Sequence, residues 1–345
     1  MSIKRGPLTA GEKVQLTDRK GHMLTFQLVS GGSTDTQHGQ ILHDSIIGQS
    51  EGRVIETIAG TSRKDVDSSH RPGKPWKSSR RIGGWQYTVL RPRLADYVLS
   101  MPRGAQIMYP KDIATVIELG DIRPGMRVLE SGGGSGAMGI HLLEAVGESG
   151  ELTTIEMRSD FARICEANAT LFYGERPQWW RIIAGDFDSQ APQLQDNYFD
   201  RIVLDQLDPW NRVDEVHRLI APGGVLTCYV TTTTQLSRLV EHLEQSGQWT
   251  VPHVQESLER NWKVDGLAVR PEHSMIGHTG FLVFARAMAD GFTALKKRDR
   301  PNKDTTTDID EAGINVSELE LRDMSDKKLR KVLRDLDTQI RTLVG

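Results

Sequence analysis

Residues 128–136 read VLESGGGSG, and this segment is the strongest indication of the fold class. An apolar run enters a glycine-rich turn, and an apolar helix pattern follows from Ala137, so we expect a strand, a tight turn and a helix. Glycines let the backbone approach a ligand closely, and the first N–H groups of the helix suit an anionic group. Gly132, Gly134 and Ala137 also fit the dinucleotide pattern G-x-G-x-x-A, and such turns occur without a ligand, so the stretch alone leaves the ligand open.

Around this turn, helix and strand patterns alternate. We expect strands at residues 127–130, 152–156, 181–184, 199–205 and 225–230, with helices between them. This order predicts a doubly wound α/β sheet. Two later strand-like stretches, 251–264 and 280–286, lack a helix long enough for a right-handed crossover, so they should form an antiparallel edge. An antiparallel edge strand is typical of the Rossmann-like sheet of class I methyltransferases, whereas dinucleotide dehydrogenases normally keep their sheet parallel.

Four parts are predicted along the chain. Short alternating runs punctuated by Gly, Ser and Asp indicate a small N-terminal β domain over residues 1–61. Its expected strands cover residues 13–16, 23–29, 41–47 and 53–58. Seven basic residues among Ser, Pro and Gly indicate a basic loop or linker over 62–90, and the catalytic domain should cover 91–290. Residues 291–345 should hold a basic, disordered linker and an amphipathic helix, which would pack on this protein, on another subunit or on an unknown partner protein.

Composition narrows the possible classes of protein. The 345 residues carry a net charge of -3, which argues against a uniformly basic nucleic-acid surface but allows local phosphate-binding clusters. We find no apolar run of about 18 residues and no signal-peptide order, so we expect a cytoplasmic protein without membrane contact. Cys165 and Cys228 lie in apolar stretches without metal-ligand spacing, which predicts two buried thiols and no metal site.

Acidic residues follow the next two strands. Glu156 ends its strand, where a carboxylate can accept from both ribose hydroxyls of S-adenosylmethionine or of NAD; the alternative is an acid that flanks a helix. Asp186 follows the third strand and is placed to accept from an adenine amino group, with Phe187 beside the base. A turn or helix-capping role is the alternative for Asp186.

The fourth strand ends in residues 205–210, DQLDPW, at the edge where ligands of such sheets bind. Class I enzymes that methylate a nitrogen commonly hold their acceptor here. Adenine N1 has a free lone pair, so its methylation needs alignment of N1 with the methyl donor. A fixed carboxylate would stabilise the positive charge that grows on the purine and so raise the rate by roughly a hundredfold. We expect Asp205 to have this role, because a helix-capping role fits Asp208 better.

Several motifs together resemble one family, the tRNA (adenine-N1) methyltransferases that modify adenosine 58 of the T loop. Beside the glycine turn and residues 204–210, the motifs are HDSIIG at 43–48, QIMYPKD at 106–112 and GHTGFL at 277–282. The resemblance covers most of the chain from about Leu42 to Arg286.

The resemblance implies S-adenosylmethionine as cofactor, tRNA as substrate and a homotetramer. It places the catalytic aspartate at Asp205 and two tyrosines that line the target-base pocket at Tyr109 and Tyr229, although either ring would also suit a packed core. Together with the residues argued above, the expected cofactor contacts are Gln106, Glu130, Gly132, Gly134, Ser135, Gly136, Glu156, Asp186, Phe187 and Asp205.

The sequence leaves other functions open. A class I methyltransferase could act on a small molecule or on another RNA position. An NAD-dependent oxidoreductase would need nicotinamide-side groups that we do not find, and intact Asp205, Glu156 and Gly134 argue against a noncatalytic RNA-binding subunit. The basic loop could contact tRNA phosphates or be a solvated loop.

Overall fold

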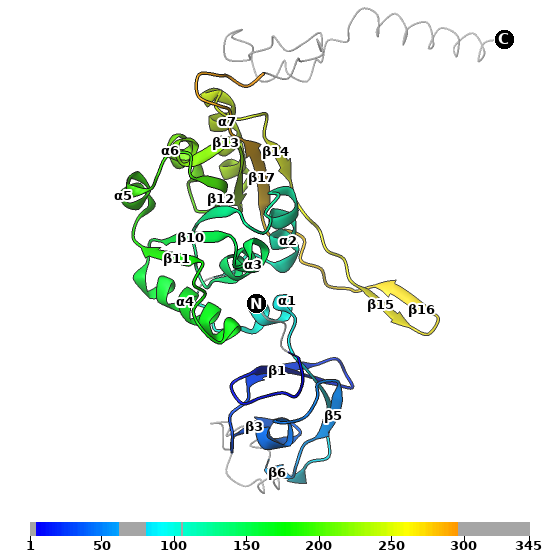
Figure 1. The fold of residues 1–345 in the computed structure, drawn as a ribbon. Coiled ribbons are helices and arrows are strands. Elements are labelled where there is room, and N and C mark those ends of the chain that lie inside the picture. The colour runs from blue at the N-terminus through cyan, green and yellow to red at the C-terminus, as the bar shows by residue number, and fades with distance from the viewer. Residues whose placement is uncertain (1–4, 62–80, 105, 296–345) are drawn as a thin grey trace, which may run out of the picture. The chain divides into compact units, whose positions relative to one another are not determined.

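The computed structural model describes residues 5–61, 81–104 and 106–295 (Figure 1). Most of the predicted basic loop and the whole predicted C-terminal helix lie outside these ranges. Among the described residues, no helix is long and apolar enough to cross a membrane.

The N-terminal region is an antiparallel β structure. Its four-stranded sheet has the order β2-β1-β8-β5, formed by β1 (Lys13–Asp18), β2 (Met23–Gln27), β5 (Arg53–Glu56) and β8 (Gln86–Leu90). Two smaller pairs and a 3-10 helix complete it: β3 (Ser33–Thr36) with β4 (Gly39–Leu42), β6 (Gly60–Thr61) with β7 (Arg81–Ile82), and η1 (His43–Ser45). Its core contains Leu16, Ile41, Tyr87 and Val89.

Two local predictions for this region need correction. We expected residues 86–90 in the linker, but β8 lies between β1 and β5 because alternate residues, Tyr87 and Val89, face the core. The strand expected over residues 41–47 ends at Leu42, where the chain turns into η1. Ile46 still reaches the core from the end of that helix, which explains its strand-like apolar spacing.

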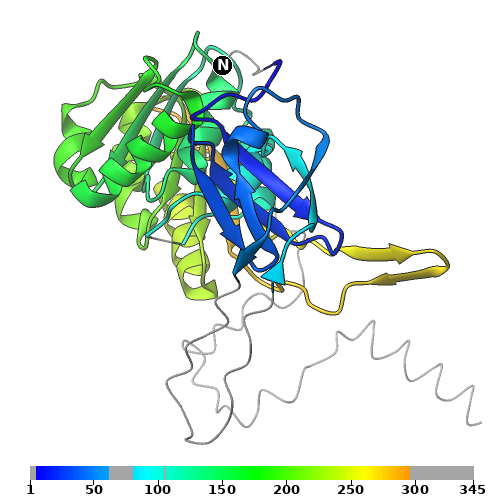
Figure 2. The same cartoon turned by 90° about the horizontal axis from the view of Figure 1, so that it is seen from below.

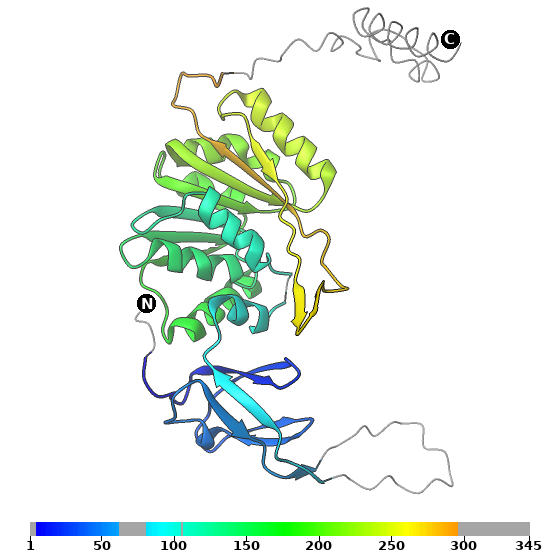
Figure 3. The same ribbon diagram turned by 90° about the vertical axis from the view of Figure 1, so that its right-hand side faces the viewer.

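The main domain contains the predicted doubly wound sheet with an antiparallel edge (Figure 3). Its strand order is β11-β10-β9-β12-β13-β17-β14. The strands are β9 (Arg127–Ser131), β10 (Glu151–Glu156), β11 (Trp180–Ala184), β12 (Phe199–Asp205), β13 (Ile220–Val230), β14 (His253–Gln255) and β17 (Phe281–Arg286). The first five strands of this order are parallel, and β17 pairs antiparallel with β13 and β14. The predicted fold class is confirmed.

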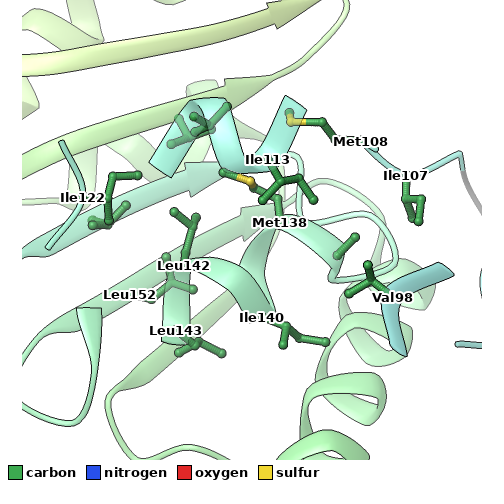
Figure 4. Packing of buried hydrophobic residues seen from close by; sticks show 14 of the residues in the cluster. Val98, Ile107, Met108, Ile113, Ile122, Met138, Ile140, Leu142, Leu143 and Leu152 are labelled. Carbon is green, nitrogen blue, oxygen red and sulfur yellow. The ribbon is translucent and has the colours of Figure 1, made fainter. Parts of the chain in front are cut away.

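Helices cover both faces of this sheet. They are α1 (Leu94–Ser100), α2 (Pro110–Leu119), α3 (Ala137–Val146), α4 (Ser159–Tyr173), α5 (Phe187–Gln190), α6 (Val213–Leu219) and α7 (Thr233–Ser246), with 3-10 helices η2 (Ala191–Gln193) and η3 (Pro209–Arg212). On one face, Ile113 of α2 lies beside Met138 of α3 (Figure 4). Leu239 and Leu243 of α7 belong to the core of the opposite face. Both faces are therefore apolar, as a parallel sheet requires.

A two-stranded arm leaves the main domain between β14 and β17 (Figure 1, Figure 2). It consists of β15 (Trp262–Asp265) and β16 (Ala268–Pro271), which pair with each other. We expected one strand over residues 251–264, but only β14 joins the sheet and the rest leads into the arm. The arm exposes apolar side chains at Trp262, Val264, Leu267 and Val269.

Candidate active site

The glycine turn joins β9 to α3 and has positive φ angles at its key positions. Gly132 has φ +98°, and a Cβ added there would lie 2.1 Å from the Asp205 carbonyl oxygen. Gly134 has φ +50°, and nothing in the protein lies within 4 Å of the place its Cβ would take. The turn therefore touches the end of β12 on one side and leaves open space for a ligand at Gly134.

Glu156 connects this turn to the end of β10. Its Oε2 accepts a hydrogen bond from the Gly134 N–H at 2.8 Å, and its Oε1 accepts from the Arg158 N–H at 2.9 Å. The second contact is the helix-flanking role, since Arg158 directly precedes α4. Each carboxylate oxygen can accept a further bond, so this geometry still allows the predicted ribose contact.

Glu130 is a buried acid beneath the turn. Its Oε2 accepts from Thr154 Oγ1 at 2.7 Å, and Trp180 Nε1 donates to the same Thr154 oxygen at 2.9 Å. Burial, followed by the nearby charges of Asp205 and Glu156, raises the pKa of Glu130 to about 8. Glu130 is therefore mainly a neutral acid at pH 7.

Three buried polar atoms near the turn have no hydrogen-bond partner in the protein: Glu130 Oε1, Ser135 Oγ and Gln206 Oε1. Gln206 is tied to the turn, because its Nε2 donates to Ser131 Oγ. Buried polar atoms rarely lack a partner, so their grouping fits a polar ligand. With the cradle at Gly134, the residues present fit the nucleoside and amino-acid parts of S-adenosylmethionine.

Asp186 and Phe187 lie at the expected edge of the sheet, but their side chains have structural roles. Asp186 caps α5 by accepting from the Asp188 N–H at 3.1 Å, which is the alternative role considered for it. The Phe187 ring is buried in the core with Leu129 and Ile155. The Phe187 ring is thus packed in the core, and its contact with the adenine base stays a prediction.

Asp205 lies at the carboxyl end of β12, where it is the register partner of Tyr229 on β13. Its side chain is half-buried. Burial, with a further contribution from the Glu156 charge, raises the pKa of Asp205 to about 6, so it is mainly ionised at pH 7. The Asp208 carboxylate has structural partners instead, because it pairs with Arg212 at 2.7 Å and accepts a hydrogen bond from Asn211 Nδ2 at 2.8 Å.

Gln106 and Tyr109 line a surface cavity of about 370 Å³ just before α2. Its other lining residues are Arg103, Gly104 and Ile107. Arg103 was not predicted as a site residue, since no local spacing distinguishes it from other exposed arginines.

Tyr229 is buried beneath the segment before β17. Its hydroxyl donates to the Thr279 carbonyl oxygen at 2.6 Å, and a Cβ on Gly280 would lie 2.4 Å from the ring carbon Cζ. Burial is the main reason that the pKa of Tyr229 lies above its usual range, so the phenol stays neutral. The structure thus brings the motifs around residues 106–112, 204–210 and 277–282 toward one edge of the sheet, although sequence reasoning did not identify Thr279 as a site residue.

The sheet order, the glycine turn after β9 and the acids that end β10 and β12 define a class I S-adenosylmethionine-dependent methyltransferase. Residues 84–266, more than half of the chain, match the family described as tRNA methyltransferase complex GCD14 subunit, and residues 6–55 match the TrmI-like N-terminal family. The chain belongs to the GCD14 tRNA methyltransferase family. Among the described residues, no group of His, Cys, Asp and Glu could hold a metal ion.

The names of two relatives agree with this assignment. The chain is 29% identical over 271 residues to the tRNA (adenine(58)-N(1))-methyltransferase TrmI of Thermus thermophilus, covering 79% of this chain and 95% of that protein. It is 32% identical over 225 residues to the tRNA (adenine(57)-N(1)/adenine(58)-N(1))-methyltransferase TrmI of Methanocaldococcus jannaschii, covering 59% of this chain and 79% of that protein.

Solved structures show the same architecture. A SAM-dependent O-methyltransferase of Thermotoga maritima has a TM-score of 0.70 and 27% identity, over 82% of this chain and 95% of that chain. The tRNA (m1A58) methyltransferase TrmI of Aquifex aeolicus has a TM-score of 0.66 and 24% identity, over 82% of this chain and 100% of that chain, and shows the fold alone.

Proposed function

We propose that this protein methylates N1 of adenosine 58 in the tRNA T loop, with S-adenosylmethionine as methyl donor. The observation that carries this proposal is the position of Asp205, which meets the glycine turn at Gly132 and is the register partner of Tyr229. A carboxylate between a cofactor turn and an aromatic side chain suits a nitrogen acceptor that becomes positively charged. The names of the relatives supply the position in tRNA.

Each residue of the site has a distinct part in this proposal. The glycine turn, Glu130 and Glu156 hold the cofactor, which when bound supplies a methyl group on a positively charged sulfur. Ionised Asp205 faces the acceptor base and stabilises the positive charge that develops on the purine, an effect worth about a hundredfold in rate. Tyr229 is neutral, and its hydroxyl donates a hydrogen bond to the Thr279 carbonyl oxygen, so it serves as part of the pocket wall and not as a base.

A small-molecule acceptor is the main alternative, and the Thermotoga neighbour is named an O-methyltransferase. The match of residues 6–55 to an N-terminal family of tRNA-modifying enzymes favours RNA. A second RNA position also has support, because the Methanocaldococcus relative is named for adenine 57 as well as adenine 58. The test therefore has to separate both adenosines.

We also infer that the enzyme acts in the cytoplasm on tRNA and as a homotetramer. The arm formed by β15 and β16 supports assembly, because it exposes Trp262, Val264, Leu267 and Val269 and because an isolated two-stranded hairpin is marginally stable in water. Sedimentation of a Trp262→Ser, Leu267→Ser variant should show smaller species than the wild type. Unchanged sedimentation would show that the apolar side chains of the arm do not hold the subunits together.

The direct experiment measures label transfer from radioactive S-adenosylmethionine to unmodified tRNA transcripts. Three transcripts are compared. The first has the natural sequence, the second has guanosine in place of adenosine 58, and the third has a pyrimidine in place of the base at position 57. Incorporation that is lost only with the change at 58, and lost in Asp205→Ala, supports the proposal. Equal labelling of all transcripts refutes the position, and no labelling despite cofactor binding refutes tRNA as the acceptor.

A further inference from the structure

A buried ion pair lies behind Tyr229 at the start of α2. Lys111 Nζ is 2.7 Å from Asp112 Oδ1, and the Asp112 side chain is completely buried. Lys111 Nζ also donates to Thr279 Oγ1 and to the Ser257 carbonyl oxygen, each at 2.7 Å. The three ammonium protons thus have three acceptors on three different segments of the chain.

Thr279 connects this ion pair to Tyr229. Its hydroxyl accepts from Lys111 and donates to Asp112 Oδ2 at 2.7 Å, while its carbonyl oxygen accepts from the Tyr229 hydroxyl at 2.6 Å. The next residue, Gly280, lies against the Tyr229 ring so closely that a Cβ would overlap it. The position of the Tyr229 ring therefore depends on where Thr279 is held.

The chemistry of this cluster suits a positioning role. Burying two charges is costly, and well-packed apolar residues often stabilise a fold as well as a buried ion pair does. Hydrogen bonds differ from apolar contacts because they fix direction as well as distance. The cluster also joins Ser257 and Thr279, the two ends of the segment that carries the arm, to one helix terminus.

We propose that Lys111, Asp112 and Thr279 form a positioning unit that fixes Tyr229 beside Asp205 and thereby orients the acceptor base. This inference rests on the proposed function. The three residues act through Tyr229, so they govern how a bound base is oriented and leave the cofactor turn unchanged.

Thr279→Val and Thr279→Ser test the unit, because valine keeps the shape and loses the hydroxyl, whereas serine keeps the hydroxyl. Thr279→Val should lower kcat with tRNA by at least about tenfold and change the KM for tRNA much less, since small misplacements reduce the rate of aligned reactions. Thr279→Ser should recover most of the rate. The affinity for S-adenosylhomocysteine should be the same in all three proteins.

Thr57→Val is the matched control for lost stability. Thr57 is a buried threonine of the N-terminal β region whose hydroxyl donates to the His38 carbonyl oxygen and accepts from the Trp85 N–H. This variant loses the same kind of buried hydroxyl and should keep its kcat. If Thr57→Val lowers kcat as much as Thr279→Val, or if Thr279→Ser is as slow as Thr279→Val, the positioning unit is refuted.

A second measurement does not depend on the substrate. In protein labelled with 3-fluorotyrosine, the Tyr229 signal is assigned by its loss in Tyr229→Phe, and it should shift in Thr279→Val but not in Thr279→Ser. In the Tyr229→Phe background, Thr279→Val should cost less additional rate than in the wild type, since coupled residues are not additive. An unshifted Tyr229 signal overturns the positioning proposal, whereas a wild-type enzyme that labels no tRNA overturns only the proposed function.

Discussion

Replacement of Gly132 by alanine tests how closely the glycine turn approaches the end of β12. The added Cβ would lie 2.1 Å from the Asp205 carbonyl oxygen, and real Cβ contacts essentially never fall below 3.0 Å, so the two must separate by about 0.9 Å. A displacement near 1 Å in an aligned site costs about a hundredfold in rate, or about 2.7 kcal/mol. The positive φ angle and the overlap should also lower the free energy of unfolding by about 2–4 kcal/mol.

Gly134→Ala is the matched control. It also places alanine at a positive φ angle, but its Cβ meets nothing within 4 Å. We expect a stability loss of only about 1 kcal/mol and weaker binding of S-adenosylhomocysteine, because the methyl group enters the space assigned to the ligand. Urea denaturation, calorimetric titration of S-adenosylhomocysteine and kcat with tRNA measure the three quantities. Near-normal kcat in Gly132→Ala, or equal stability losses in the two variants, would refute this account of the turn.

Three further predictions concern pH. The kcat/KM should fall about tenfold per pH unit below pH 6, because protonation removes the negative charge of Asp205. Asp205→Asn should be slower and should lack this fall in rate at low pH. The same fall in Asp205→Asn would contradict its assignment to Asp205. Burial raises the pKa of Glu130 to about 8, so the folded protein keeps a proton that the unfolded chain loses, and stability falls as pH rises from about 4.5 to 8. As pH rises from 5 to 8.5, the free energy of unfolding of Glu130→Gln, measured by urea denaturation, should therefore increase relative to that of the wild type by on the order of 1 kcal/mol or more. An equal pH slope in both proteins would exclude a buried neutral acid. The Glu256 carboxylate, with the Thr231 carbonyl, raises the pKa of His278, so its stabilisation is present below about pH 6.5 and is lost as pH rises through the folded-state pKa. Thermal melts of His278→Gln should lack this component, and melts that follow the wild type at every pH would show that His278 contributes none.

The correct sequence predictions rest on short-range signals. The β9 strand, the glycine turn and α3 follow one another within 20 residues, and apolar period and glycine position are local properties. The position of Asp205 follows from the same logic, because the carboxyl ends of parallel strands share one edge of a sheet. The predictions that failed needed partners elsewhere in the chain. Strand β8 was assigned to a linker because its partners β1 and β5 are far away in sequence.

Local sequence signals were enough to predict the doubly wound sheet with its antiparallel edge, the glycine turn after β9 and the place of Asp205 at the carboxyl end of β12. Periodicity, glycine conformation and strand polarity are local properties of the chain. The folded chain was needed to establish which groups are charged and which atoms they contact. Glu130 is a neutral acid because the folded core removes water from it, and Asp186 caps α5 because its own backbone turns there. Asp112 and Thr279, 167 positions apart, share a hydrogen bond that no sequence spacing predicts, since burial and long-range contact arise only when distant segments pack together.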